Sequence, residues 1–135
     1  KQDLSKRDAQ AARDAFDIFK ELVERFPHSR YANDARERMY ELIHAQAQYE
    51  INTAMYYYKR DAYIAAINRC QTVLNDFQST DQAEEALQIM KDSYKALGME
   101  DKVKDIERII EANQNRPSKK TVQHIIQAPQ VEAPQ

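Results

Sequence analysis

Few side chains in this sequence have the type and spacing that chemistry requires, and the first candidate is a Glu-x-x-His pair. Glu41 and His44 stand three residues apart in a stretch with helical character, and this spacing ligates di-iron centres in helical bundles. Such a centre also needs a second Glu-x-x-His motif and two further carboxylates on facing helices, and the sequence has no second copy of the motif. We therefore interpret the pair as solvated helix residues, and the sequence predicts no metal site.

The single cysteine, Cys70, is the strongest candidate nucleophile. A reactive thiolate favours an exposed, electropositive position, whereas Cys70 falls in the apolar stripe of an expected helix. We expect it to fill the core, and one cysteine cannot form a disulfide within the chain. The sequence predicts no catalytic residue, no cofactor and no enzyme.

Three consecutive tyrosines, Tyr56, Tyr57 and Tyr58, have the side chains for a stacking surface or a ligand pocket. Three neighbouring residues on a helix span about 200°, so two of them at most share a face. We expect Tyr57 or Tyr58 to pack in the core and Tyr56 to reach an outer surface. An exposed tyrosine there suits an interface, because aromatic residues and Arg are enriched in binding hot spots.

Basic residues gather at Lys59 and Arg60 and again at Arg69. Arg69 directly precedes Cys70, so its guanidinium should point outward from the edge of the apolar stripe. A guanidinium binds a carboxylate through two parallel hydrogen bonds, which favours Arg for pairing across an interface. Position alone leaves two interpretations open: Arg69 meets an acidic residue of a partner, or it forms an intramolecular surface pair worth about 0–1 kcal/mol.

The elements that hold these residues are expected to be helical. The chain of 135 residues contains one Gly and four Pro, too few for a fold rich in tight turns, and good helix formers dominate. Its 20 basic and 22 acidic residues give a net charge of −2, without the basic excess that nucleic-acid binding needs. No apolar run approaches the roughly 20 residues of a membrane-spanning helix.

Apolar residues recur at steps of three and four in successive segments, which is the period of an amphipathic helix. Phe26-Pro27 ends the first segment, because a residue before proline is disfavoured in the helical region, and Ser29 is well placed to cap the second. Gly98, the only glycine, suits the left-handed position that follows a helix. We expect the second segment to form one long helix, with a break near Gln46 as the alternative. The expected helices span about residues 5–26, 30–60, 63–77, 81–97 and 100–113.

The first and third segments are copies of one pattern at an offset of 51 residues. The matched pairs are Ala15 with Ala66, Phe16 with Ile67, Phe19 with Cys70, Leu22 with Val73, Val23 with Leu74, Phe26 with Phe77, Ser29 with Thr80, Ala32 with Ala83, Ala35 with Ala86 and Met39 with Met90. A tetratricopeptide repeat has about 34 residues, so the offset equals one and a half repeats. Because no helix buries its apolar face alone, we expect an all-α, tetratricopeptide-like α-solenoid of antiparallel helix pairs, with one long helix fusing two repeats.

The solenoid is expected to occupy residues 1–113 as one domain. Residues 114–135 are rich in Pro and Gln, with Val122, Ile125 and Ile126 as the only apolar anchors. We expect this segment to be a flexible tail, because it has too little apolar surface to offset the entropy of ordering.

A more particular pattern runs through the second half of the chain. It comprises Tyr49-Glu50, the run AMYYYKRDAY from Ala54 to Tyr63, the run IAAINR from Ile64 to Arg69, and AEEAL from Ala83 to Leu87. In these motifs the chain resembles the BamD family of tetratricopeptide lipoproteins, most closely over residues 49–98 and more weakly over residues 10–112. Asp61 replaces a usual turn glycine and Gln78 replaces a usual proline, so we expect local differences at both turns.

The resemblance implies a non-catalytic scaffold of the outer-membrane β-barrel assembly machinery. Such a scaffold docks on the periplasmic POTRA domains of the barrel subunit BamA and supports folding and insertion of outer-membrane proteins. Other lipoproteins of the machinery and unfolded outer-membrane proteins are further expected partners. The implied location is the periplasmic face of the outer membrane, with a lipid anchor and two earlier repeats that this chain lacks.

The resemblance also points to the partner-binding residues. Asn68 and Arg69 match the family's Asn-Arg pair on the helix that faces BamA, and we expect Arg60, Lys59 and Tyr56 to take part as well. A tetratricopeptide receptor for carboxylate-terminated peptides or chaperones is the alternative of the same kind, and it needs several Lys, Arg and Asn side chains in one groove. A helical-bundle enzyme or metal protein is the alternative from another class, which a metal analysis would test.

Overall fold

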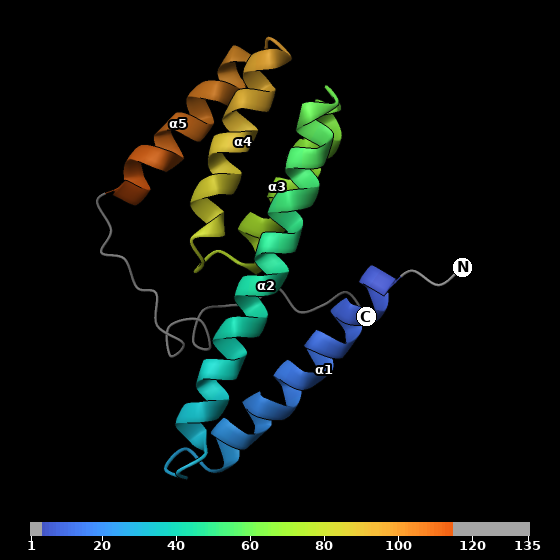
Figure 1. The fold of residues 1–135 in the computed structure, drawn as a ribbon. Helices are drawn as coiled ribbons and strands as arrows, with labels where there is room; N and C mark the ends of the chain where they lie inside the picture. The colour runs from blue at the N-terminus through green and yellow to red at the C-terminus, as the bar shows by residue number, and fades with distance from the viewer. Residues whose placement is uncertain (1–3, 115–135) are drawn as a thin grey trace.

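The computed structural model describes residues 4–114, which form helices joined by short turns (Figure 1). In chain order the helices are α1 (Leu4–Arg25), α2 (Ala32–Lys59), α3 (Tyr63–Asp76), α4 (Gln82–Ala96) and α5 (Glu100–Gln114). No strand occurs between residues 4 and 114. The all-α class is confirmed, and each expected helix is present. Beyond Gln114, the expected tail lies outside the described residues.

The second helix, α2, is one unbroken helix of 28 residues, about 42 Å long at 1.5 Å per residue. It contains neither Gly nor Pro, so nothing in its backbone interrupts the helical hydrogen bonds, and the alternative of a break near Gln46 is wrong. It begins at Ala32, two residues later than expected. Ser29 is not its cap: Ser29 Oγ accepts a hydrogen bond from Tyr31 N at 3.1 Å, within the turn that precedes the helix.

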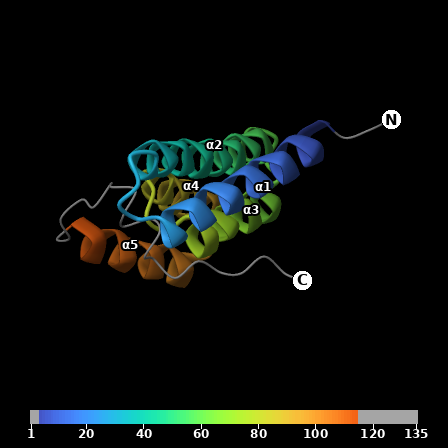
Figure 2. The same cartoon turned by 90° about the horizontal axis from the view of Figure 1, so that it is seen from below.

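The helices pack as antiparallel pairs, and α2 belongs to two of them. The first half of α2 lies along α1, and its second half lies along α3 (Figures 1 and 2). The fourth helix packs against both α3 and α2, and α5 packs against α4. The long helix therefore fuses two repeats, as the offset of 51 residues predicts. Within residues 4–114, no helix has both the length and the apolar character that crossing a bilayer demands.

The turns after α1 and α3 have the same backbone hydrogen bonds. The matching pairs are Phe26 N to Leu22 O (2.9 Å) with Phe77 N to Val73 O (2.8 Å), Ser29 N to Phe26 O (3.0 Å) with Thr80 N to Phe77 O (3.1 Å), and Ala32 N to Ser29 O (3.0 Å) with Ala83 N to Thr80 O (3.1 Å). Gln78 stands in this turn where the first copy has Pro27. The flanking residues therefore make the same backbone bonds with Gln78 as with Pro27, and the local difference from the family's turn stays a prediction.

Two described residues have a left-handed backbone, Asp61 with φ 61° and Gly98 with φ 73°. Gly98 follows α4 and turns the chain back into α5, as predicted. Asp61 lies between α2 and α3 and takes the conformation that favours glycine, which Asp and Asn adopt more easily than other side chains. The turn thus keeps its glycine-type geometry without a glycine.

The residue that matches Gly98 at the offset of 51 is Ala47. Ala47 lies in the middle of α2 and is completely buried. The chain turns back at Gly98, whereas it continues as helix through Ala47. This difference between the copies produces the long shared helix.

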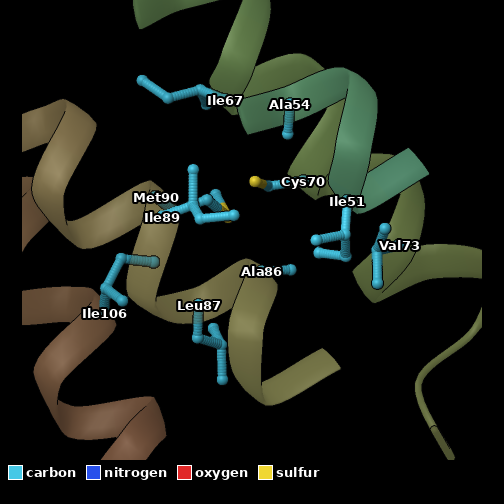
Figure 3. Packing of buried hydrophobic residues seen from close by; sticks show 10 residues of the cluster. All are labelled: Ile51, Ala54, Ile67, Cys70, Val73, Ala86, Leu87, Ile89, Met90 and Ile106. Carbon is cyan, nitrogen blue, oxygen red and sulfur yellow. The ribbon is translucent and has the colours of Figure 1, made fainter. Parts of the chain in front are cut away.

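Two hydrophobic clusters form the core of the described part of the chain. The smaller one lies between α1 and α2 and contains Val23, Ala35 and Met39, with Phe16, Phe19 and Leu22 partly buried against it. The larger one joins α2, α3, α4 and α5 (Figure 3) and contains Ile51, Ala54, Ile67, Cys70, Val73, Ala86, Leu87, Ile89, Met90 and Ile106. Three alanines in or beside the larger cluster, Ala54, Ala66 and Ala86, are completely buried and let neighbouring helices approach closely.

Candidate protein-binding surface

The residues predicted to bind a partner lie on the antiparallel pair of α2 and α3. Tyr56 and Lys59 belong to the end of α2, Arg60 directly follows it, and Asn68 and Arg69 lie in the middle of α3. All of these residues are exposed. The surface is therefore accessible, and its parts differ in how the side chains are held.

Tyr56 and Arg60 form one stacked unit. Arg60 Cζ lies 3.6 Å from the centroid of the Tyr56 ring, and Arg60 Nη1 donates a hydrogen bond to Tyr56 O at 3.0 Å. The Tyr56 ring also meets the Tyr57 ring edge to face, with 5.6 Å between centroids. A cation–π contact at an exposed site is worth about 0.5–1 kcal/mol. These contacts hold the guanidinium plane of Arg60 in one orientation at the surface.

The tyrosine run is divided as expected. Tyr56 keeps 53% of its exposure, whereas Tyr58 is partly buried against the larger core cluster. Tyr58 also contacts the ring of Tyr63, with 5.6 Å between centroids. The prediction that one tyrosine faces outward while a neighbour packs inward is confirmed.

The turn between α2 and α3 is held by Asp61 and Tyr63. Tyr63 Oη donates a hydrogen bond to Asp61 Oδ1 at 2.9 Å. This bond to a carboxylate, together with partial burial, raises the pKa of Tyr63 above its usual value, because the ionised phenol would lose the bond and meet a like charge. The contact ties the first residue of α3 to the turn and so helps to set the register of the two helices.

Arg69 pairs across the two helices with Glu50 of α2. Arg69 Nη1 lies 3.4 Å from Glu50 Oε2. The side chain of Arg69 is 46% exposed, whereas that of Glu50 is only 16% exposed. Of the two interpretations left open for Arg69, the intramolecular pair is formed. Contact of the exposed part of the guanidinium with a partner remains a prediction.

The basic side chains do not converge on one point. Arg60 stands ten residues beyond Glu50, which corresponds to about 15 Å along a helix. Arg69 is held beside Glu50 and so lies well away from the stack of Tyr56 and Arg60. The surface has two separate basic groups along the helix pair.

Glu50 is a candidate that sequence reasoning missed, because it had no role there beyond its place in the resemblance. Residues at equal distances from the turn of an antiparallel helix pair face each other. Tyr58 meets Tyr63 in this way, and Glu50 meets Arg69 further from the turn. Folding the two expected helices about Arg60 would have found the pair.

A polar junction joins α2 to the start of α4 and accounts for His44. Tyr40 Oη lies 3.0 Å from His44 Nε2, and Gln82 Nε2 lies 3.4 Å from His44 Nδ1. Gln82 is buried, and its Nε2 also donates to Gln48 Oε1 at 3.0 Å. Both ring nitrogens of His44 therefore face groups of the protein.

Glu41 and His44 make separate contacts. Its Oε2 lies 3.9 Å from Arg38 Nη1, on an exposed part of α2. Among residues 4–114, no three His, Cys, Asp or Glu side chains come together in a way that could hold a metal ion. The Glu-x-x-His spacing is thus divided between a surface ion pair and the polar junction.

Cys70 is completely buried in the larger cluster, where it lies among apolar side chains (Figure 3). Burial raises the pKa of its thiol to about 12, because the thiolate would lose its hydration. At neutral pH the group is a protonated thiol. The prediction that Cys70 fills the core is confirmed.

Antiparallel helix pairs stacked about one shared helix define the class of this protein as a tetratricopeptide-like helical solenoid. The match to a family model is more specific. Residues 1–109 match the YfiO family, which is described as an outer membrane lipoprotein family. The chain belongs to this family. It is thereby assigned to the outer membrane, on the periplasmic side.

Curated relatives of the chain are named as outer membrane protein assembly factors. The chain is 46% identical over 112 residues to the outer membrane protein assembly factor BamD of Neisseria meningitidis serogroup A, an alignment that covers 83% of this chain and 42% of the relative. It is 37% identical over 111 residues to BamD of Vibrio cholerae, covering 82% of this chain and 46% of the relative. The chain spans less than half the length of these relatives. The resemblance to the BamD family is confirmed.

Proposed function

We propose that this chain is part of a non-catalytic scaffold in outer-membrane protein assembly, and that it docks on the periplasmic POTRA domains of the barrel subunit BamA. Docking would hold the subunit in place while outer-membrane proteins fold and insert. The names of the relatives support a role in outer-membrane protein assembly, since these relatives are outer membrane protein assembly factors. The exposed side chains of α2 and α3 support this helix pair as the contact surface.

The observation that carries the proposal is the placement of Arg69. It lies in the middle of α3 with its guanidinium partly exposed and one edge held by Glu50. Arg is favoured for interfaces because its planar fork matches a carboxylate. Asn68 beside it and the stack of Tyr56 and Arg60 add exposed polar and aromatic groups of the kind that dominate binding hot spots. Lys59 adds charge at the same end of α2.

Further partners follow from the same proposal. Other lipoproteins of the assembly machinery and unfolded outer-membrane proteins are candidates for the remaining solenoid surface. The family is one of lipoproteins, so we propose that membrane attachment of the whole protein depends on a lipid anchor and not on the helices of this chain.

Binding to isolated POTRA domains tests the proposal. Arg69→Gln should weaken binding at least tenfold, the scale of a moderate hot spot. Arg108→Gln is the matched control, because Arg108 is an exposed arginine of α5 whose ion pair among the described residues is with its helix neighbour Asp105 at 2.9 Å. Charge reversal at Arg69 is the poorer test, because Arg69→Glu would place a carboxylate against Glu50 and disturb the chain itself.

Two outcomes would contradict the proposal. If the unmodified chain does not bind the POTRA domains but binds a carboxylate-terminated peptide, the peptide-receptor alternative is correct. If the chain binds and Arg69→Gln has no more effect than Arg108→Gln, the docking surface lies elsewhere.

A further inference from the structure

Glu50 is unusually well covered for an acidic side chain on a helix that has a solvent-exposed face. Only 16% of its side chain is exposed, and its carboxylate lies beside Arg69 of the neighbouring helix at 3.4 Å. A carboxylate this far covered loses much of its hydration and depends on a counter-charge. The next residue, Ile51, belongs to the larger core cluster. Glu50 is therefore fixed to a rigid part of the scaffold.

The pair uses only part of the arginine. A guanidinium carries five N–H donors on three nitrogens, and within residues 4–114 its single ion pair is made through Nη1. The side chain of Arg69 is still 46% exposed. The edge formed by the other nitrogens is thus the part that can meet an incoming carboxylate. Glu50 is itself an anion and only 16% exposed, so it offers no donor to that carboxylate.

We propose that Glu50 is a positioning residue for partner binding: it fixes one edge of Arg69 so that the opposite edge faces a carboxylate of the partner. This inference rests on the proposed function, and it adds a residue that does not itself touch the partner. A long side chain that is already ordered loses less freedom when it binds. Glu50 on α2 therefore orders the exposed guanidinium of Arg69 on α3 before the partner binds.

Two other roles for Glu50 make different predictions. If Glu50 only neutralised Arg69 and competed with the partner's carboxylate, its removal would free the guanidinium and strengthen binding. If Glu50 only stabilised the helix pair, its removal would act on folding and would add to the effect of any change at Arg69. The three roles therefore differ in the sign of the effect and in its dependence on Arg69.

The experiment is a double-mutant cycle of Glu50→Gln and Arg69→Gln, measured as affinity for purified POTRA domains, with thermal unfolding of each variant. Gln keeps the shape of Glu50 and removes its charge. Glu50→Gln should weaken binding about threefold to tenfold, the range expected when one long side chain loses its prior ordering. In the Arg69→Gln background the same change should alter affinity less than about twofold, because the residue through which it acts is absent.

Glu41→Gln is the matched control, because Glu41 is also on α2 and paired with an arginine but is 65% exposed and lies in the first half of the helix. It should leave affinity unchanged. If the unmodified chain binds and Glu50→Gln binds equally well or more tightly, the positioning role is overturned while the proposed function stands. Additive losses in the cycle would likewise reject it in favour of a purely structural role. If the unmodified chain does not bind at all, both proposals fail.

Discussion

The chain contains two copies of one helical hairpin, α1 with the first half of α2 and α3 with α4, and they are buried to different depths. In the second copy Ile67, Cys70 and Val73 are buried. Their matched residues in the first copy, Phe16, Phe19 and Leu22, remain partly exposed. The turns of the two copies nevertheless share the same hydrogen bonds. The same pattern thus produces the same backbone, while neighbours decide how deeply it is buried.

The reason for the difference is the position of each copy in the solenoid. The second half of α2 covers α3 on one side, and α5 covers α4 on the other. The first helix, in contrast, packs along α2 alone among the larger helix contacts of the described residues. Among residues 4–114, a repeat packed between two neighbours buries more of its apolar face than a repeat that contacts one neighbour. Substitutions at matched positions should therefore have unequal effects.

The largest effects are expected at the matched methionines, Met90 and Met39, which are both buried. Met90→Ala should lower the free energy of unfolding by about 3 kcal/mol, because its closely packed neighbours cannot fill the cavity. Met39→Ala should cost about 2 kcal/mol, since the partly exposed Phe16 and Phe19 can move into the space. Urea unfolding followed by circular dichroism measures both values. Equal losses would show that the two clusters are equally rigid.

The matched phenylalanines after α1 and α3 provide a clearer contrast. Phe77 packs against the larger cluster, whereas Phe26 is 57% exposed. Phe77→Ala should lower the free energy of unfolding by about 2 kcal/mol, and Phe26→Ala should change it by less than about 0.5 kcal/mol. The same unfolding measurement compares them. A large loss at Phe26 would contradict the exposed position of this side chain.

Two single substitutions, Gly98→Ala and Ala47→Gly, test the position where the copies diverge. Gly98→Ala should cost about 1–2 kcal/mol because of its positive φ, and no atom within 4 Å would clash with the added Cβ. Ala47→Gly should cost about 1 kcal/mol, because it weakens the interior of α2. Thermal unfolding of each variant gives the order. Stabilisation by Gly98→Ala would mean that the turn into α5 does not need the left-handed conformation.

The smallest effect is expected where α1 and α3 end. The first helix ends at Arg25, which suits the negative end of a helix, whereas α3 ends at Asp76. Partial burial raises the pKa of the Asp76 carboxyl above its usual value. Asp76→Asn should therefore raise the free energy of unfolding by about 0.5 kcal/mol at pH 7.

The pH dependence of this gain gives the control. Because the folded chain binds the Asp76 proton more tightly than the unfolded chain does, the cost of Asp76 is fully present above the folded pKa. It disappears as the pH falls through that pKa toward the unfolded value of about 3.9. Asp76→Asn should thus have no stabilising effect at about pH 3. A gain that persists there would assign the effect to packing and not to charge.

Much of the architecture could be predicted from local sequence. Pro27, Gly98 and the uninterrupted segment that became α2 fixed where helices end and continue, and the offset of 51 residues identified the repeat. The resemblance pointed to Arg69. The sequence did not reveal Glu50 as its neighbour, because an ion pair between helices depends on their register, and no local pattern encodes that register directly. The predicted start of α2 was wrong because Ser29 Oγ accepts its hydrogen bond from Tyr31 N, within the turn that precedes the helix.

Helix type, the approximate limits of the helices and the inward face of each helix were set by the sequence alone, because they depend on neighbouring residues and on a period of about 3.6 residues. How deeply the matched residues of each copy are buried within residues 4–114 was decided only in three dimensions. The same holds for the anion that holds Arg69 and for the separation of its guanidinium from that of Arg60. Burial and charge pairing depend on which helices meet, and meeting is a property of the whole stack and not of any one segment.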